Sequence, residues 1–327
     1  MRRGPGHNGA VLTVTIAQPD VLDRLTDLGR DGRVRLVPWD VSGPLPDGVE
    51  ARDVAAVVMP SSGVTPERLG RLHDLPALRL VQLPSAGYEH ALAHAPTRAA
   101  LSNGRGVHDA GTAELAVGLL LASFRGIDDA ARAMPEGRWA PTLRRSLADR
   151  RVMVLGHGSI GSAVARRLAA FEVEIVRVAR SARVEDGEQV HGVADLPRLL
   201  PEVDAVVTVL PLTEGADGTS GLVDAGFLAA LPDGAVLVNV GRGKVVDTEA
   251  LLAEVSTGRL RAALDVTDPE PLPADHPLWR APGVLLTPHV GGWTDATGPR
   301  LAALVRRQVE ALLAGTGPLN VVRPAQT

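Results

Sequence analysis

Short apolar segments that alternate with helix-like stretches constrain the fold of this chain more than any other sequence feature. Ten such segments are predicted to be strands, at residues 11–17, 34–39, 54–59, 80–83, 152–155, 174–179, 205–210, 235–240, 262–266 and 284–287. Their apolar residues are continuous rather than alternating with polar ones, so we expect sheets covered by helices on both faces. The pattern predicts an α/β fold built from doubly wound parallel sheets.

A glycine-rich loop near the middle of the chain indicates how these strands divide between domains. The loop at 156–161 has the form Gly-X-Gly-X-X-Gly, follows a predicted strand and opens a predicted helix at 159–171. Because such a loop belongs near the start of a nucleotide-binding domain, we predict that domain at residues 104–295. Residues 1–103 and 296–327 are then expected to form a discontinuous second domain into which the first is inserted.

The same loop has the chemistry of a dinucleotide site. Its first glycine permits a tight turn, the second lets a pyrophosphate approach the backbone, and the third lets the helix pack on the strand. The N terminus of the helix supplies N–H groups and positive potential for the phosphates. The residues predicted to contact the cofactor here are Gly156, His157, Gly158, Ser159, Ile160 and Gly161.

The segment after the next predicted strand indicates which dinucleotide is used. An NAD site usually has an acidic residue there, about twenty residues beyond the loop, to bind the ribose 2′-hydroxyl. This chain has Arg180, Ser181 and Arg183 instead, which can bind a 2′-phosphate. We therefore predict that NADP(H) is preferred and that NAD(H) can also be used. A solvated loop is the alternative, which the nearby Glu185 and Asp186 keep open.

Three residues in the C-terminal half, each at the end of an apolar run, provide the groups that hydride transfer at a 2-keto acid requires. Arg242 can hold a negative substrate and polarise its carbonyl, and His289 can donate or accept the hydroxyl proton. Glu270 can orient this imidazole and stabilise its charged form. Taken singly, the three residues would also fit a surface ion pair, a rigid loop acid and a core histidine.

These motifs resemble the D-isomer-specific 2-hydroxyacid dehydrogenase family. The resemblance extends from about Val81 to about Trp293 and includes residues 81–88, 111–117, 156–161, 211–213, 239–243, 264–266, 270–271 and 287–292 in family order. It implies a Rossmann nucleotide-binding domain inserted into a flavodoxin-like substrate domain. It also implies an NAD(P)-dependent oxidoreductase that acts on a small 2-keto or 2-hydroxy acid of D configuration.

The resemblance assigns roles to individual residues. Arg242 would bind the substrate carboxylate and carbonyl, His289 would be the acid/base, and Glu270 would pair with His289. The backbone of Ala86 and Gly87 would be a second carboxylate anchor, with Tyr88 bordering the substrate pocket, and Asp265 would contact the nicotinamide carboxamide. The remaining cofactor contacts implied are Thr112, Pro211, Val240, Gly241, His289 and Gly291.

Within the family, Arg180 and Arg183, which follow the predicted strand at 174–179, are similar to the arginines of glyoxylate/hydroxypyruvate reductases. We therefore expect a reductase. Three alternatives stay open at this stage. They are a non-catalytic NAD(P)-binding regulator of the corepressor type, a phosphoglycerate dehydrogenase and a phosphite dehydrogenase.

Composition limits the other partners. The net charge of −4 predicts no nucleic-acid surface, and no apolar run has the length of a membrane span. The chain has no cysteine, and no His, Asp or Glu spacing suggests a metal site. Residues 1–9 are expected to be a frayed tail rather than a signal peptide, which predicts a cytoplasmic protein.

Two further expectations concern source and assembly. Lys244 is the only lysine among 34 basic residues, a bias that indicates a GC-rich, bacterial genome. The nearly all-apolar helix predicted at 112–124 and the Arg138-Trp139 segment match the region where family members form homodimers. A homodimer is therefore predicted, although burial of this helix between domains would explain the same apolarity.

Overall fold

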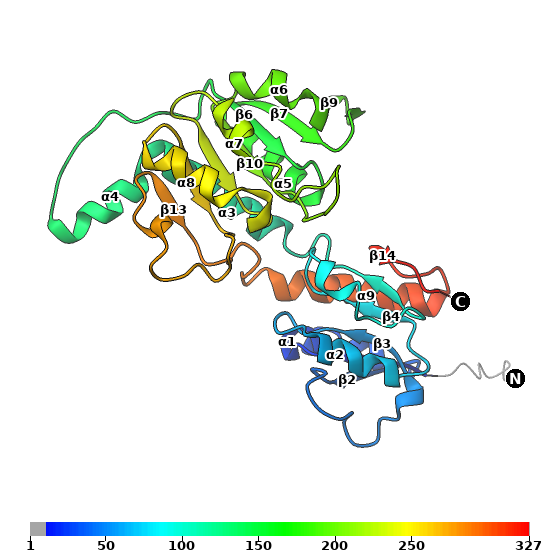
Figure 1. Cartoon of the computed structure of the whole chain (residues 1–327). Helices are drawn as coiled ribbons and strands as arrows, with labels where there is room; N and C mark the ends of the chain where they lie inside the picture. The colour runs from blue at the N-terminus through cyan, green and yellow to red at the C-terminus, as the bar shows by residue number, and fades with distance from the viewer. Residues whose placement is uncertain (1–10, 327) are drawn as a thin grey trace, which may run out of the picture. The chain divides into compact units, whose positions relative to one another are not determined.

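The computed structural model describes residues 11–326, which form two compact units. Unit 1 comprises residues up to His108 together with those from Asp295 onward, and unit 2 is the continuous segment Asp109–Thr294 (Figure 1). Unit 2 is therefore inserted into the chain of unit 1. The predicted tail at 1–9 lies outside the described residues.

Unit 1 is built on a six-stranded sheet with the order β14-β5-β4-β3-β1-β2. Its strands are β1 (Leu12–Ile16), β2 (Val34–Pro38), β3 (Val54–Val58), β4 (Leu80–Gln82), β5 (Ala100–Ser102) and β14 (Val321–Arg323). All neighbouring strands pair in parallel except β14, which is antiparallel to β5. The order of β1 to β5 is that of the flavodoxin-like doubly wound sheet.

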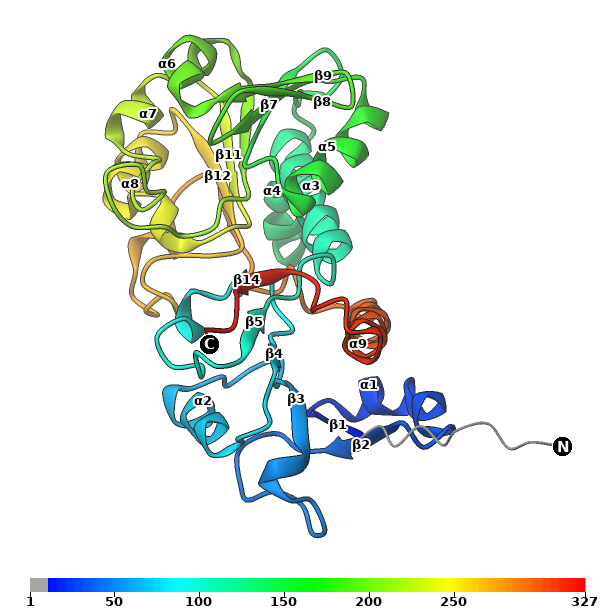
Figure 2. The same ribbon diagram turned by 90° about the vertical axis from the view of Figure 1, so that its right-hand side faces the viewer.

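Helices cover both faces of this sheet, which explains its continuous apolar strands. Helices α1 (Pro19–Asp23) and α9 (Thr297–Ala314) pack on one face, and α2 (Pro66–Arg71) packs on the other (Figure 2). Helix α9 buries Leu301, Leu304 and Val305 in the same apolar cluster as Val14 and Ile16 of β1. Burial of such side chains contributes about 1.5–3 kcal/mol each.

Unit 2 contains an eight-stranded sheet with the order β13-β12-β11-β10-β6-β7-β9-β8. Its strands are β6 (Arg151–Leu155), β7 (Glu174–Ala179), β8 (Arg183–Glu185), β9 (Glu188–Gly192), β10 (Ala205–Thr208), β11 (Val236–Asn239), β12 (Arg261–Leu264) and β13 (Val284–Leu286). Only β8 pairs in antiparallel fashion, with β9. From β9 across to β12 the order is that of a Rossmann sheet, which reverses between β6 and β10.

Two apolar clusters lie on opposite faces of this second sheet. Helices α3 (Asp109–Arg125) and α5 (Ser159–Leu168) contribute to one. Helices α6 (Leu196–Leu199), α7 (Ala225–Ala229) and α8 (Thr248–Ser256) contribute to the other. The predicted α/β fold with two doubly wound sheets is thus confirmed, and the apolar residues of α3 are accounted for by burial within unit 2.

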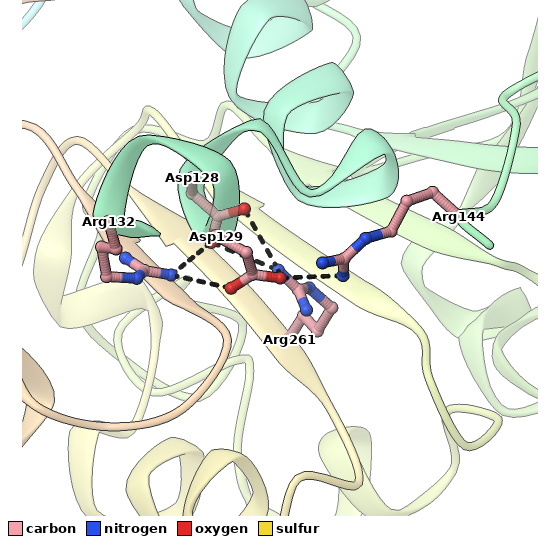
Figure 3. Close-up of polar contacts among 5 residues, drawn as sticks. All are labelled: Asp128, Asp129, Arg132, Arg144 and Arg261. Carbon is pink, nitrogen blue, oxygen red and sulfur yellow. Dashed lines mark hydrogen bonds and ion pairs between the residues drawn. The ribbon is translucent and has the colours of Figure 1, made fainter. Parts of the chain in front are cut away.

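Helix α4 (Ile127–Ala133) follows α3 after a left-handed residue, Gly126, and extends away from the sheet of unit 2 (Figure 1). Ion pairs fasten it to β12. The buried carboxylate of Asp128 lies 2.6 Å from Arg132 and 3.2 Å from Arg261. Figure 3 draws this cluster of ion pairs. Asp129 pairs with Arg144 at 2.8 Å. Burial raises the pKa of Asp129, but the neighbouring arginines, Arg261 foremost, outweigh it and lower the pKa overall.

Within residues 11–326, no single helix is long and apolar enough to cross a membrane. The pair Asp109–Arg125 and Ile127–Glu136 reaches the length and composition of a span only when the two helices are taken together, and they are bent by 69°.

Candidate active site

The glycine-rich loop joins β6 to α5 in unit 2. Gly156 has φ +108°, and a Cβ atom there would meet the carbonyl oxygen of Val209 at 2.9 Å. A Cβ on Gly161 would lie 1.9 Å from the carbonyl oxygen of Gly156, so the helix can start only because both residues are glycine. A Cβ on Gly158 would meet nothing within 4 Å, and no side chain caps α5. The loop thus leaves open backbone in front of a helix N terminus, which suits a phosphate group.

Ser159 and Ile160, the other two predicted loop contacts, form the first turn of α5. The Ser159 hydroxyl donates to a carboxylate oxygen of Asp109 at 3.1 Å, which connects this turn to the start of α3. Asp109 was not among the predicted site residues. The sequence offered no signal for it, because the contact joins segments 50 residues apart.

His157 occupies the second position of the loop and is partly buried. Burial lowers the pKa of its imidazole, Glu185 opposes this shift, and Arg177 and Arg183 add to it. The ring is therefore neutral at physiological pH and adds no positive charge beside the loop.

The cofactor-selecting residues follow β7. Arg180, Ser181 and Arg183 are all exposed, and Arg180 forms no hydrogen bond or ion pair with the part of the chain that the structure describes. Arg183 instead lies on β8, where it pairs with Glu185 and donates to the backbone oxygen of His157 at 3.2 Å. The alternative interpretation of this segment was a solvated loop, but Arg183–Glu185 forms a strand.

His289 lies on the loop after β13, in a left-handed backbone conformation with φ +53°. That region is uncommon for a residue other than glycine, so the surrounding structure must hold it. The His289 N–H donates to the backbone oxygens of Asp265 at 2.8 Å and Thr287 at 3.0 Å. The side chain itself remains half exposed, which leaves it accessible to a substrate.

The buried carboxylate of Asp265 holds the loop that carries His289. One oxygen accepts from the Thr287 hydroxyl at 2.6 Å and the Val290 N–H at 2.9 Å, and the other accepts from the Gly291 N–H at 2.9 Å. The residue predicted to contact nicotinamide thus has a positioning role in the structure. Gly291 also lies against Thr112 of α3, because a Cβ there would be 3.5 Å from the Thr112 Cα.

The carboxylate of Glu270 contacts the imidazole directly. Its Oε1 atom lies 2.5 Å from Nδ1 of His289. A carboxylate at this distance selects the tautomer with a proton on Nδ1, which leaves Nε2 to exchange a proton with a ligand. This arrangement is that of a general acid/base with its orienting partner.

Arg242 follows β11 on a loop that lies directly against the Glu270 loop. A Cβ on Gly243 would sit 1.9 Å from the backbone oxygen of Thr267, so the two backbones touch there. A Cβ on Gly241 would be 2.8 Å from the backbone oxygen of Leu210, which precedes Pro211. The loops that carry Arg242, Glu270 and His289 therefore meet at the carboxyl edge of one parallel sheet, where ligands bind in such folds.

Asn239 shapes the arginine loop and was missed as a site residue. Its side-chain oxygen accepts from the Thr208 hydroxyl at 2.8 Å and the Gly241 N–H at 3.0 Å, and its amide donates to the Arg242 backbone oxygen at 3.0 Å. A buried asparagine that ends an apolar strand was the available signal. Val240, another predicted cofactor contact, is buried in the apolar cluster to which α3 and α5 contribute.

The predicted carboxylate anchor lies in unit 1, after β4. The Ser85 hydroxyl donates to the Gly87 backbone oxygen at 2.7 Å, and the Asn103 amide donates to that of Ala86 at 2.7 Å. The N–H groups of Ala86 and Gly87 donate to no other described residue. Two adjacent unused N–H groups form a ready site for a carboxylate. Tyr88, in contrast, packs against the apolar core of unit 1.

Among residues 11–326 no cluster of three or more His, Asp or Glu side chains is arranged to hold a metal ion.

Comparison with known proteins identifies the family. The model for the D-isomer-specific 2-hydroxyacid dehydrogenase NAD-binding domain matches residues 117–291. A glyoxylate reductase from Korarchaeum cryptofilum is 35% identical over 258 residues, which cover 76% of each chain. The chain therefore belongs to the D-isomer-specific 2-hydroxyacid dehydrogenase family, and it is an oxidoreductase with an NAD-binding domain.

Solved structures agree with this assignment. A D-isomer-specific 2-hydroxyacid dehydrogenase from Xanthobacter autotrophicus, in complex with NADPH, has a TM-score of 0.80 at 29% identity and covers 96% of this chain and 98% of its own. An NADPH-dependent glyoxylate/hydroxypyruvate reductase from Sinorhizobium meliloti, in complex with citrate, has a TM-score of 0.75 at 29% identity. It covers 95% of this chain and 97% of its own.

Proposed function

We propose that this protein uses NADPH to reduce a small 2-keto acid of the glyoxylate or hydroxypyruvate kind to the D-2-hydroxy acid. The observation that carries the proposal is the 2.5 Å contact between Glu270 and His289, on a loop that Asp265 fixes from within the core. The names of the relatives from Korarchaeum cryptofilum and Sinorhizobium meliloti support the same reaction.

In the proposed reaction, the guanidinium of Arg242 binds the anionic acid and polarises its carbonyl. His289 donates a proton from Nε2 to the carbonyl oxygen, and Glu270 stabilises the imidazolium from which that proton comes. Bound NADPH would supply the hydride to the carbonyl carbon. The open backbone at Gly158 and the uncapped start of α5 fit its pyrophosphate.

We assign the N–H groups of Ala86 and Gly87 to carboxylate binding. A cavity of about 260 Å³ lies beside them in unit 1 and includes Ser61, Ser62, Ser85 and His90 in its lining. Hydroxyl and imidazole groups favour a short polar substituent over a large apolar one. Apolar residues, among them Val64 and Leu83, also line the cavity, and we assign the substrate substituent to its polar part, as for hydroxypyruvate.

The preference for NADPH rests on the residues after β7. Arg180 and Ser181 are exposed, and neither side chain is bonded to another described residue. Both can therefore turn to a 2′-phosphate without first breaking a contact. The complex of the Xanthobacter autotrophicus relative with NADPH supports this choice.

The test is oxidation of NADPH and of NADH, followed at 340 nm with glyoxylate, hydroxypyruvate, pyruvate and phenylpyruvate. We expect turnover with NADPH and the two polar acids, with a higher kcat/KM than for phenylpyruvate. Clear NADPH binding without turnover of any acid would contradict the proposal and favour the regulator. A preference for phenylpyruvate would contradict the substrate assignment.

We further propose that the protein is a homodimer joined through residues 127–143. Large apolar side chains are exposed there: Trp139 is 93% and Met134 77% exposed, and Leu143 is fully exposed. The ion pairs of Asp128 and Asp129 hold the helix that begins this segment in place (Figure 3). A fixed, exposed apolar surface of this kind marks a protein interface, and a second copy of the chain is the occupant that we propose.

Light scattering after size exclusion tests this assembly. The wild-type protein should have twice the 34.1 kDa mass of the chain. Replacing Trp139 and Leu143 by glutamate should give the monomer mass, because two charges would be buried without partners. The matched pair Trp139→Phe and Leu143→Met should remain dimeric. A monomeric wild-type protein at micromolar concentration would contradict the proposal.

We also propose a cytoplasmic location, in which a largely reduced NADPH pool favours the reductive direction.

A further inference from the structure

Glu185 forms an ion pair with Arg183, which is one of the two arginines expected to recognise a 2′-phosphate. Its Oε2 atom lies 2.8 Å from Nε and 2.5 Å from Nη2 of Arg183. The same Nη2 also donates to the backbone oxygen of His157 at 3.2 Å. Three of the five N–H groups of the guanidinium are thereby used within the protein, and only the two on Nη1 are left.

A β-hairpin enforces this pairing. Arg183 and Glu185 are two residues apart on β8, so their side chains project from the same face of the strand. Asp186 and Gly187 connect β8 to β9 with φ +53° and +81°, the two left-handed residues of a tight hairpin turn. The hairpin therefore keeps Glu185 and Arg183 within reach of each other on one face of the strand.

Two of the groups near this carboxylate add little positive charge. Burial lowers the pKa of the neighbouring His157, so that its ring is uncharged. Arg177 pairs with Glu188 at 3.1 Å. His157, Arg177, Glu185 and Glu188 line one cavity of about 250 Å³ together with Asp186 and with Arg166 of α5. The positive charge available to a phosphate near the glycine loop is therefore that of Arg180 and Arg166 plus a partly neutralised Arg183.

We propose that Glu185 sets the discrimination between NADPH and NADH by withholding Arg183 from the 2′-phosphate. The inference rests on the proposed use of NADPH. Arg180, which has no contact to break, is the permanent anchor of the phosphate. For Arg183, the 2′-phosphate must compete with the carboxylate of Glu185. A 2′-hydroxyl carries no charge, so Glu185 penalises NADPH and leaves NADH unaffected.

The size of the effect follows from charge alone. A carboxylate and a phosphate that share one guanidinium are separated by roughly 6 Å, and the site is half exposed, so water screens most of their repulsion. We expect Glu185→Gln to tighten binding of the 2′-phosphate by roughly tenfold. The glutamine keeps the size of the side chain and removes its charge.

Calorimetric titration of 2′,5′-ADP and 5′-AMP tests the proposal, because these two probes differ only in the 2′-phosphate. The ratio of their Kd values should rise roughly tenfold in favour of 2′,5′-ADP in Glu185→Gln. Asp186→Asn is the matched control: it removes an adjacent exposed carboxylate, and asparagine tolerates the same left-handed backbone. Its ratio should stay at the wild-type value.

A double-mutant cycle shows whether Glu185 acts through Arg183. In an Arg183→Ala background, Glu185→Gln should give a clearly smaller gain, whereas a general charge effect would give the same gain in both backgrounds. In the enzyme assay, Glu185→Gln should lower KM for NADPH without changing kcat or the KM for NADH.

The outcomes separate the two proposals. If the wild-type protein binds 2′,5′-ADP and 5′-AMP equally, and Arg180→Ala changes neither, the proposed use of NADPH is wrong. If the wild-type protein prefers 2′,5′-ADP and Arg180→Ala reduces that preference, but Glu185→Gln leaves the ratio unchanged or lowers it, Glu185 does not withhold Arg183. An equal gain in Asp186→Asn would also overturn its specific role.

Discussion

Replacing His289 by alanine should reduce kcat for the keto acid roughly 10³-fold, within the range that general acid catalysis contributes. The variant keeps the carboxylate and cofactor sites but has no group to protonate the carbonyl oxygen as the hydride arrives. Affinity for NADPH, measured by quenching of protein fluorescence, should be unchanged, because the glycine-rich loop lies on a different part of the sheet edge. The loss should therefore appear in turnover and not in binding.

The Glu270 contact makes the test sharper. Glu270→Gln retains the hydrogen bond to Nδ1 but removes the charge that stabilises the imidazolium, so its kcat should fall by a smaller factor, roughly 10- to 100-fold. His94→Gln, at an exposed histidine of unit 1, is the control and should keep wild-type activity. If His289→Ala retained most of its turnover, another group would have to be the proton donor.

Replacing Arg242 by alanine should lower kcat/KM by roughly 10²- to 10³-fold, the usual cost of losing one group that stabilises developing charge. Both kcat and KM should change, since the guanidinium binds the acid in the ground state and its carbonyl oxygen in the transition state. Arg242→Lys should recover only part of the loss, because an ammonium cannot match the planar, forked geometry of the guanidinium.

Two measurements keep this prediction specific. Arg280→Ala removes an exposed arginine from the same unit and should leave kcat/KM at the wild-type value. Thermal unfolding should show only a modest difference between Arg242→Ala and the wild-type protein, because Asn239 also holds the loop when the bond from Arg242 Nη1 to the Gly241 backbone oxygen, 2.7 Å long, is lost. A pure KM effect with unchanged kcat would show that Arg242 only binds substrate.

The sequence was sufficient to predict the strands that form both cores. Val54–Val58 and Ala205–Thr208 are buried along their whole length, so their uninterrupted apolar residues carry a clear signal. The glycine loop was equally clear, since Gly156 and Gly161 are required by backbone contacts that no other residue permits.

Strands at the sheet edges, and the strands next to them, were missed for the opposite reason. Val321–Arg323 at one edge and its neighbour Ala100–Ser102 have only three residues each and few apolar side chains. Arg183–Glu185 at the edge of the other sheet and its neighbour Glu188–Gly192 are largely polar and only partly buried, because this end of the sheet is not covered on both faces. The Asp186-Gly187 pair between them is a strong hairpin signal that would have identified both.

The side-chain network beneath the candidate site could not be predicted either. Asn239 and Asp265 are both nearly inaccessible to solvent, and each binds backbone groups of the loop that it supports. Such bonds depend on where β11, β12 and β13 lie side by side. A residue type at the end of a strand shows that a polar group is present, but not which loop it will hold.

The division of unit 1 between two stretches of sequence has a consequence for synthesis on the ribosome. Its sheet needs β14, and its apolar cluster needs Leu301, Leu304 and Val305 of α9, while Gln308 bonds Gln82 of β4 at 2.6 Å. Unit 2 is continuous and can complete its core while the rest is still being translated. The first hundred residues, although made earliest, must wait with an open apolar face until α9 emerges. In the cell, this N-terminal segment is therefore the part most in need of chaperone protection.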